Sequence, residues 1–129
     1  MAQFDEKSIL ITDDSLIARK KLKMLLKETG FKITEAVSGK EALEVIEIEN
    51  FDILLLDLLM PEVDGFEVLR NLKSRNLNMT IIVISADIQE ATKELCMELG
   101  ASGFLNKPPS KNELLDTIEN VILKNNKGI

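Results

Sequence analysis

Short apolar runs alternate with longer amphipathic segments along the chain. Three runs are almost continuously apolar, which is typical of strands buried on both faces of a parallel sheet: SILIT at 8–12, FDILLL at 51–56 and TIIVIS at 80–85. The runs FKITEA at 31–36 and SGFL at 102–105 complete the set. The 31–36 run alternates polar and apolar residues, as expected of a strand at the edge of a sheet.

Helix start signals lie between these runs. A Ser or Asp followed three residues later by Glu predicts a capped helix start, and four such residues directly precede the predicted amphipathic segments: Ser38, Asp64, Asp87 and Ser110. A further helix is expected from Ser15 with Gly30 as its C-cap, and Gly100 is expected to end the helix from Asp87. Helical spacing predicts two buried stripes: Ala18, Leu22, Leu25 and Leu26 in the first helix, and Ala91, Leu95 and Leu99 in the fourth.

This alternation predicts an α/β fold with a five-stranded parallel sheet, doubly wound (flavodoxin-like), in which right-handed crossovers place helices on both faces. The length of 129 residues fits one domain, and an eight-stranded barrel would need about twice that length. We expect a single domain over 1–129, with its core over about 7–124 and short frayed termini that include 125–129.

The composition excludes several function classes. The chain has no histidine, so it has no Ser-His-Asp triad, no His-ligated zinc and no imidazole acid–base catalysis. Its 22 acidic and 16 basic residues give a net charge of −6, which argues against a nucleic-acid-binding surface. The apolar runs fall far short of the ~20 residues of a membrane span, and 1–7 lacks the apolar core of a signal peptide. With Cys96 as its single cysteine, the protein is expected to be cytoplasmic.

Polar residues follow four of the predicted strands. In an open parallel sheet, ligands bind beyond the carboxyl ends of the strands, near the point where the strand order reverses. If the order is 2-1-3-4-5, four contiguous strands direct their polar residues to one crevice: Asp13 and Asp14, Asp57, Ser85 and Ala86, and Lys107. Asp13 taken alone would also suit the N-cap of the helix that follows it.

The charges in this crevice predict its ligand. Three carboxylates and one lysine sum to −2, which is unfavourable in a partly dehydrated cleft unless a cation joins them. Donors that are all oxygen suit a hard ion, and a few carboxylates with open positions suit Mg²⁺. Lys107 and the Ser85 hydroxyl would then face the open side of the metal, where a phosphoryl group fits both. A carboxylate beside Mg²⁺ can also act as a nucleophile and become an aspartyl phosphate.

Five motifs, in this order, resemble those of the receiver domain of two-component response regulators, and the resemblance covers essentially the whole chain. They are the acidic pair Asp13-Asp14, DLLMP at 57–61, Asp64-Gly65, Ser85-Ala86 and Lys107-Pro108. The chain is similar to the stand-alone chemotaxis response regulators, because the receiver motifs fill it and no effector domain is expected after Gly128.

The resemblance implies roles for the acidic residues. Asp57 is expected to accept a phosphoryl group from the phosphohistidine of a sensor kinase, which would make the protein a phosphoprotein. Asp14, Asp57 and the backbone carbonyl of Leu59 are expected to bind Mg²⁺ directly, and Asp13 to bind it through a water molecule.

The resemblance also implies how the phosphoryl group is held. The Ser85 hydroxyl, the Ala86 N–H and the Lys107 ammonium are expected to contact its oxygens. The peptide bond between Lys107 and Pro108 is typically cis in this family. Phe104 stands where the family has its switch aromatic, commonly Tyr, which turns inward as Ser85 closes on the phosphoryl group.

No enzymatic activity is expected beyond self-phosphorylation and self-dephosphorylation. In this family the dephosphorylation rate depends on the side chains two residues after the phosphoacceptor and two after the switch hydroxyl, here Leu59 and Asp87. An apolar Leu59 cannot orient an attacking water, so we expect slow hydrolysis. A Mg²⁺-dependent phosphohydrolase is the alternative outside the family, but its haloacid-dehalogenase type needs a second acid where Leu59 stands.

The expected partners are a sensor histidine kinase or His phosphotransfer domain, and an output protein. Leu16, Ile17 and Met24 fall off the buried stripe of the first helix and, with Pro108, are candidates for docking the kinase. Isolated surface Leu and Ile are also normal, so this alternative stays open. Output is expected through the face of the fourth helix, fifth strand and fifth helix. It is either chemotaxis-type binding to a flagellar motor switch or relay of the phosphoryl group to a His phosphotransfer domain.

Overall fold

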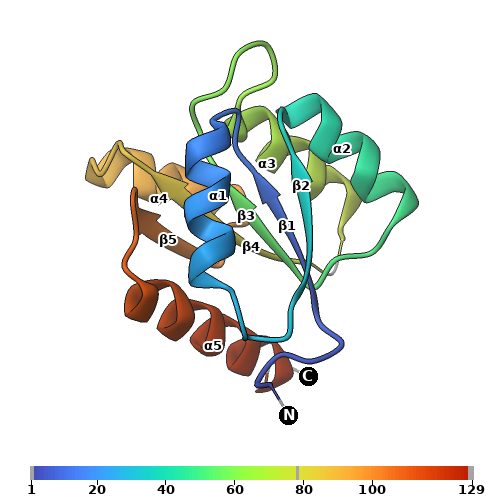
Figure 1. Cartoon of the computed structure of the whole chain (residues 1–129). Helices are drawn as coiled ribbons and strands as arrows, with labels where there is room; N and C mark the ends of the chain where they lie inside the picture. Colours follow the sequence, from blue (N-terminus) through green and yellow to red (C-terminus); the bar gives the residue numbers. More distant parts are fainter. Residues whose placement is uncertain (1, 78, 128–129) are drawn as a thin grey trace.

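Five parallel strands form one sheet in the order β2-β1-β3-β4-β5, which confirms the predicted topology (Figure 1). The computed structural model describes residues 2–77 and 79–127. The strands are β1 (Ser8–Thr12), β2 (Lys32–Ala36), β3 (Ile53–Leu56), β4 (Thr80–Ser85) and β5 (Gly103–Asn106). The helices are α1 (Leu16–Leu25), α2 (Gly39–Ile48), α3 (Gly65–Arg75), α4 (Glu90–Glu98) and α5 (Lys111–Lys127).

The strands end almost level with one another. Thr12, the last residue of β1, pairs with Ala36 at the end of β2 and with Leu56 at the end of β3. Ser85 of β4 pairs with Asn106 of β5. Since β1 lies between β2 and β3, the order in which the chain adds strands reverses between β1 and β3. The residues that follow these two strands therefore meet at the switch point of the sheet.

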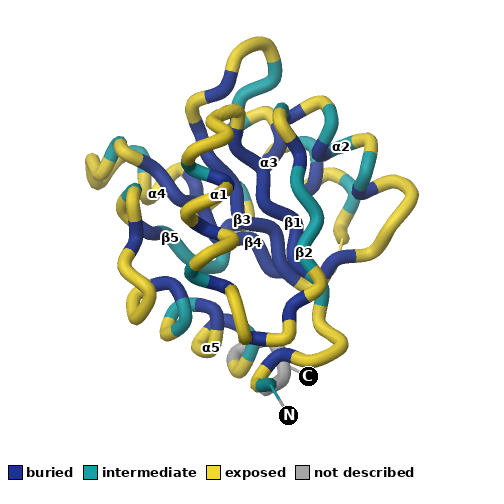
Figure 2. Tube along the Cα trace, viewed as in Figure 1, coloured by how far each residue is buried: buried dark blue, intermediate teal, exposed yellow. Residues whose placement is uncertain are grey.

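Each face of the sheet carries its own hydrophobic layer. Along β3, Leu54 and Leu56 pack in the layer of α2, α3 and α4, whereas Ile53 and Leu55 pack in the layer of α1 and α5. This alternation follows from the two-residue period of a strand. In Figure 2, β3 and β4 are dark because they are buried along their full length, whereas β2 is partly exposed, as predicted for an edge strand.

Three of the four predicted capped helix starts are confirmed. In each, the side chain of the capping residue accepts a hydrogen bond from the backbone N–H three residues later: Ser38, Asp64 and Ser110. The prediction that a helix starts at Asp87 is wrong, because α4 begins at Glu90. The Asp87 carboxylate instead accepts hydrogen bonds from the N–H of Gln89 at 3.0 Å and from the Thr92 hydroxyl at 2.8 Å, so it braces the turn before the helix.

The buried side of α4 also differs from the predicted one. Cys96 is fully buried, while Ala91 and Leu95 are exposed, so the predicted stripe through Ala91 and Leu95 is wrong. The hydrogen bond from the Thr92 hydroxyl to Asp87 holds the side of the helix that carries Thr92 and Cys96 inward.

The two glycines expected at helix ends behave differently. Gly100 directly follows the C-cap of α4 with a φ of +105°, as predicted for a left-handed helix end. Gly30 is not the C-cap of α1, because the helix ends at Leu25 and is capped by Leu26. Gly30 instead takes its φ of +92° in the turn that leads into β2.

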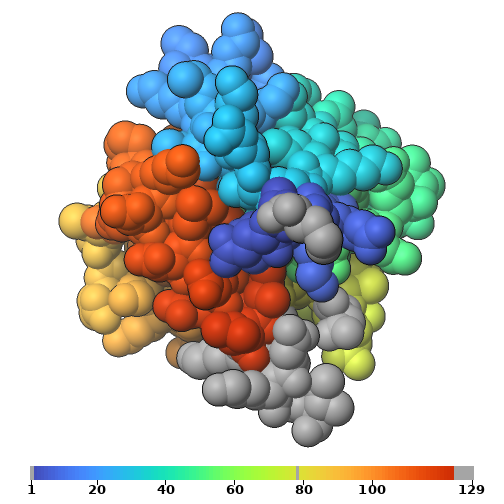
Figure 3. Space-filling view, turned by 60° about the horizontal axis from the view of Figure 1, so that its bottom comes forward, coloured from blue at the N-terminus to red at the C-terminus, as the bar shows by residue number. Residues whose placement is uncertain are grey.

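The N-terminal segment packs against the domain. The Phe4 ring is buried and stacks on Phe31 with ring centroids 4.6 Å apart, so the core extends beyond the predicted limit at residue 7. Figure 3 shows this segment lying against α5, where the Gln3 amide donates to the Glu119 carboxylate at 3.3 Å. Frayed residues were expected from Asn125, but α5 continues to Lys127, and 128–129 lie outside the described residues. No helix in the described chain has the length and apolar character needed to span a membrane.

Candidate functional site

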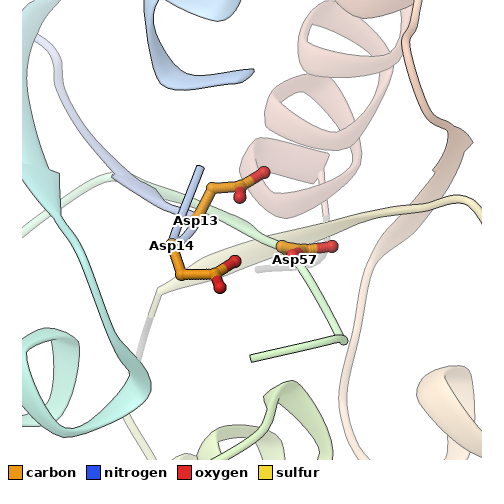
Figure 4. A group of neighbouring side chains, drawn as sticks. All are labelled: Asp13, Asp14 and Asp57. Atoms are coloured by element: carbon orange, nitrogen blue, oxygen red, sulfur yellow. The ribbon is translucent and has the colours of Figure 1, made fainter. Parts of the chain in front are cut away.

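Three carboxylates gather beyond the carboxyl ends of β1 and β3 (Figure 4). One oxygen from each of Asp13, Asp14 and Asp57 lies within 4.8 Å of the others. Asp13 and Asp57 are buried, and Asp14 is exposed. The sheet thus brings together the acids that the sequence places at two strand ends, and leaves one of them open to solvent.

Backbone contacts hold the two buried acids at the strand ends. The N–H of Asp13 donates to the Ala36 carbonyl at 3.2 Å, and the N–H of Asp57 donates to the Thr12 carbonyl at 3.0 Å. Both bonds extend the parallel ladder one residue beyond the strands. The loop after Asp57 folds back closely: a Cβ on Gly65 would lie 2.6 Å from the Asp57 carbonyl oxygen, so this approach requires glycine.

Lys107 lies between the two buried acids. Its Nζ is 2.7 Å from Asp13 Oδ2 and 3.5 Å from Asp57 Oδ1. Its backbone N–H donates to the Ser85 carbonyl at 2.9 Å, which ties the loop after β5 to the end of β4. The peptide bond between Lys107 and Pro108 is cis, as the resemblance implied.

Asp13 is not the N-cap of α1. That position belongs to Ser15, whose hydroxyl accepts a hydrogen bond from the N–H of Ala18 at 3.2 Å. The N–H of Ser15 in turn donates to Asp13 Oδ1 at 2.9 Å. One carboxylate oxygen of Asp13 is therefore held by the backbone and the other by Lys107, so the capping alternative for Asp13 is wrong.

The titration of the site reflects an excess of negative charge. Burial and the charge of Asp13 raise the pKa of Asp57 from 3.8 to about 6, against the opposing effects of Lys107 and the N–H of Leu59. Burial alone would lower the pKa of Lys107, but its hydrogen bond to Asp13 and the charge of Asp57 raise that pKa above 10.5. Lys107 therefore stays protonated at neutral pH, and its single charge does not balance the carboxylates around it. A further cation is favoured.

An open hollow of about 410 Å³ adjoins the carboxylates. Asp14, Ser85 and Asp87 line it together with the loop 58–61. Ser85 is buried, and its hydroxyl oxygen accepts a hydrogen bond from the N–H of Asp87 at 3.0 Å, while Ala86 is exposed. The hollow thus borders both Asp14, an acid of the cluster, and the hydroxyl-bearing residue Ser85.

The similarity of this chain to known proteins extends over both the sheet and the acidic site. The family profile of the response regulator receiver domain matches residues 9–119. The chain belongs to this family. Two solved structures are similar in fold and sequence. The CheX–CheY–BeF3–Mg²⁺ complex from Borrelia burgdorferi gives a TM-score of 0.87 at 32% identity, over 92% of this chain and 90% of that one. The chemotaxis protein CheY4 of Vibrio cholerae gives 0.83 at 27% identity, over 89% and 98%.

Curated relatives of this receiver domain are longer proteins. The alkaline phosphatase synthesis transcriptional regulatory protein PhoP of Bacillus subtilis is 35% identical over 108 residues, which cover 84% of this chain and 45% of PhoP. The chain spans half or less of the length of the first curated relatives it matches. A transcriptional regulator and a chemotaxis protein thus share the receiver, so the family alone does not identify the output.

The donors of this receiver domain fit Mg²⁺. Receiver domains generally bind Mg²⁺ at an acidic pocket, and the three clustered groups here are carboxylates, the hard oxygen donors that this ion prefers. Asp14 is exposed, so the pocket has a wet side on which a hydrated ion can enter. Leu59 lies in the loop that lines the neighbouring hollow, and its carbonyl as a metal ligand stays a prediction.

The predicted switch aromatic lies on the edge strand β5. Phe104 pairs with Val83 of β4 and packs, half-buried, against the hydrophobic layer of α2, α3 and α4. This position is next to the strand that ends in Ser85, as a coupled movement of Ser85 and Phe104 requires. Its role as a switch stays a prediction.

The candidate docking residues lie near one groove. Leu16, Ile17 and Met24 are 54%, 66% and 75% exposed. Ile17, Met24 and Pro108 line an open groove of about 420 Å³ between α1 and the loop after β5, which Asp13 and Lys107 also reach. Leu16 is not among its lining residues. The groove connects an apolar surface directly to the acidic site.

Sequence reasoning missed Arg19. This residue of α1 is buried, and its Nη1 donates to the carbonyl of Asp13 at 2.7 Å while its Nε contacts Glu35 at 3.0 Å. The available signal was its spacing, because Arg19 stands three and seven residues before Leu22 and Leu26 and so lies on the buried side of the helix. A charged residue on that side needs buried partners.

Proposed function

We propose that this receiver domain is a phosphorylation switch in which Asp57 accepts a phosphoryl group from the phosphohistidine of a sensor kinase or His phosphotransfer domain. The observation that carries the proposal is the position of Lys107, whose Nζ lies 2.7 Å from Asp13 and 3.5 Å from Asp57 at the mouth of the acidic cluster. The domain has no separate substrate to turn over, and its chemistry is limited to its own phosphorylation and dephosphorylation.

The residues of the site divide the transfer among them. An oxygen of Asp57 forms the new O–P bond while the P–N bond of the phosphohistidine breaks, and the electron pair of that bond leaves on the imidazole nitrogen. Mg²⁺ held by Asp13, Asp14 and Asp57 would neutralise charge on the phosphoryl oxygens. The ammonium of Lys107 would bind one of those oxygens, and its distance of 3.5 Å from Asp57 supports this role.

Phosphorylation is proposed to act through Ser85. Its hydroxyl oxygen now accepts from the N–H of Asp87, at the turn that leads into α4. A phosphoryl group on Asp57 offers this hydroxyl and the N–H of Ala86 new acceptors, so the turn would move and Phe104 would follow. To raise the active population from 1% to 99%, the group must favour the active state by about 5.5 kcal/mol.

Intact mass after incubation with acetyl phosphate tests the proposal, since the chain has no Trp or Tyr to report by fluorescence. Wild type is expected to gain one phosphoryl group in Mg²⁺ and none in EDTA, and Asp57→Asn is expected to gain none. Asp52→Asn removes an exposed carboxylate at the opposite end of the sheet and serves as the matched control. An adduct that persists in Asp57→Asn, or no adduct in wild type from any phosphodonor, contradicts the proposal.

The output is proposed to be of the chemotaxis type, through the face of α4, β5 and α5. The similarity to CheY4 of Vibrio cholerae supports it, and so does the exposure of Ile88, Leu95 and Met97 before and within α4. Relay of the phosphoryl group to a His phosphotransfer domain is the alternative. Phosphorylation-dependent binding to a flagellar motor component and phosphoryl transfer to a histidine domain are separate assays that distinguish them.

Leu59→Asn is expected to shorten the lifetime of the phosphorylated state roughly three- to tenfold. Leu59 is 80% exposed in the loop after Asp57, and its apolar side chain cannot orient a water molecule for attack on phosphorus. An amide there can hold such a water. The measurement is the loss of the phosphoryl adduct with time by intact mass. Leu77→Asn makes the same change at an exposed position away from the site, and equal lifetimes for both variants would count against the role of Leu59.

Ile17→Glu is expected to slow phosphoryl transfer from a phosphorylated His phosphotransfer domain roughly tenfold. Ile17 is exposed and lines the groove between α1 and Pro108, so a carboxylate would place a charge in an apolar contact. Phosphorylation by acetyl phosphate should be unchanged, because that donor needs no protein contact. Ile48→Glu, on the exposed side of α2, is the control; an Ile17→Glu transfer rate equal to that of the control refutes the docking role.

A further inference from the structure

Arg19 holds the backbone of the acidic pair from inside the domain. Among the lysines and arginines whose side chains the structure describes, Arg19 alone is buried. Its Nη1 donates to the carbonyl of Asp13 at 2.7 Å, and its Nε donates to Glu35 on β2 at 3.0 Å. We propose that Arg19 is a positioning residue that orients the peptide between Asp13 and Asp14 and thereby sets the affinity of the site for a divalent cation.

The contact acts on the peptide plane that carries Asp14. The carbonyl of Asp13 and the N–H of Asp14 belong to one rigid peptide unit. On the other side of Asp13, its N–H is already bonded to Ala36 at 3.2 Å. With a bond on each side, the backbone at Asp13 is held in one orientation, and the exposed carboxylate of Asp14 starts from a defined point beside Asp57.

Glu35 keeps the guanidinium in place. Its Oε1 accepts from Arg19 Nε, and its Oε2 accepts from Lys23 Nζ at 3.2 Å. Because a guanidinium is planar, fixing one of its edges on Glu35 also fixes the direction in which Nη1 points toward Asp13. The partners that orient metal-binding residues in this way typically change metal affinity by 10- to 100-fold when they are removed.

Charge and positioning predict opposite results at this residue. Arg19 is a cation close to a cation-binding pocket, so its charge alone repels Mg²⁺, and removing it would strengthen Mg²⁺ binding. If Arg19 acts by orienting the Asp13–Asp14 peptide, removing it weakens Mg²⁺ binding instead. The direction of the change therefore distinguishes the two effects.

The test is a titration of the folded protein with Mg²⁺, followed by the backbone amide signals of residues 13–15 in nitrogen-15 NMR spectra. Arg19→Met is expected to weaken Mg²⁺ binding on the order of tenfold. Lys23→Met is the matched control. It removes the same charge from the same helix, at an exposed residue that also contacts Glu35. Its Mg²⁺ affinity is expected to equal or slightly exceed that of wild type. An affinity of Arg19→Met that equals or exceeds that of Lys23→Met overturns the proposal.

Two further variants keep the test decisive if Arg19→Met is poorly folded. The double variant Arg19→Met, Glu35→Gln removes both charges of the pair, which avoids leaving Glu35 without its buried partner. It is expected to show the same weakened Mg²⁺ binding. Arg19→Lys retains the charge and a hydrogen-bond donor but not the planar guanidinium. Its Mg²⁺ affinity is expected to lie between that of Arg19→Met and that of wild type. A Mg²⁺ affinity no better than that of Arg19→Met would refute the idea that a donor at this position can partly replace the guanidinium.

This inference rests on the proposed function, because it concerns the cation of the same site. The two can fail separately. If wild type neither binds Mg²⁺ nor takes up a phosphoryl group, the proposed function fails and the role of Arg19 falls with it. If wild type does both and Arg19→Met binds Mg²⁺ as tightly as the Lys23→Met control, only the role of Arg19 is refuted.

Discussion

Replacing Asp57 with Asn is expected to stabilise the metal-free protein at pH 8 by on the order of 2 kcal/mol. The Asp57 side chain is only 7% exposed, and burial together with the charge of Asp13 raises its pKa from 3.8 to about 6. At pH 8 the folded protein therefore carries an ionised carboxylate in an unfavourable environment. Asparagine has nearly the same shape and removes this cost. Asp57, the proposed phosphoacceptor, is thus expected to lower the stability of the domain for the sake of function.

The stabilising effect of Asp57→Asn should depend on pH. Because folding raises the pKa of Asp57, the folded state binds its proton more tightly than the unfolded state does. The resulting stability is present below pH 3.8 and is lost as the pH rises through about 6. The advantage of Asn is therefore smaller at pH 4.5 than at pH 8.

Urea unfolding in EDTA at both pH values, followed by circular dichroism, measures this difference in the free energy of unfolding. Asp14→Asn changes an exposed carboxylate of the same cluster and should have a much smaller effect. Equal stability of Asp57→Asn and wild type at pH 8 would show that Lys107 fully compensates the charge of Asp57.

Lys107→Met is expected to destabilise the metal-free protein at pH 8, again on the order of 2 kcal/mol. It leaves Asp13 and Asp57 facing each other without the ammonium that lies 2.7 Å and 3.5 Å from them. The cost is below that of a fully buried pair, because the Lys107 side chain is 26% exposed. Since the pKa of Lys107 is raised, deprotonation of Lys107 itself removes its contribution only above pH 10.5.

Two comparisons separate charge from packing in Lys107→Met. At pH 5 the loss should shrink, because Asp57, with a pKa of about 6, is then largely protonated and no longer faces Asp13 as a second negative charge. Millimolar Mg²⁺ should restore part of the stability at pH 8, since a bound cation replaces the missing charge. Lys107→Arg keeps the charge and is the matched control. A loss of the same size at pH 5 and pH 8 would mean that the side chain stabilises the fold by packing alone.

The position of the acidic site was predictable because buried parallel strands leave a strong mark in the sequence. Asp57 ends a run that is too apolar for a surface segment, and the parallel ladder then places it beside the end of β1. Once β3 lies next to β1, Asp13 and Asp57 must meet, whatever the loops do. The same reasoning located Lys107, because β5 pairs with β4 and ends beside Ser85.

Contacts between side chains of different elements were not predictable in this way. The helical spacing places Arg19 on the buried side of α1, but its partner Glu35 comes from β2, and only the packing of α1 over β1 and β2 brings the two together. The predicted start of α4 was wrong for a similar reason. Asp87 has the residue type and spacing of a cap, but the Thr92 hydroxyl competes for its carboxylate and draws it into a turn before the helix.

The backbone amides of the site also differ in how readily they exchange with solvent. The N–H of Asp57 donates inside the sheet to the Thr12 carbonyl, whereas Ala86, in the turn after β4, is exposed. Amide hydrogens of the first kind exchange with solvent only when the sheet itself opens, and those of exposed loops exchange from the native state. A phosphoryl group on Asp57 would connect the slowly exchanging end of the sheet with the rapidly exchanging exposed loop. Slower exchange at Ala86, with little change at Asp57, is therefore the pattern by which the phosphorylated domain would differ from the free one.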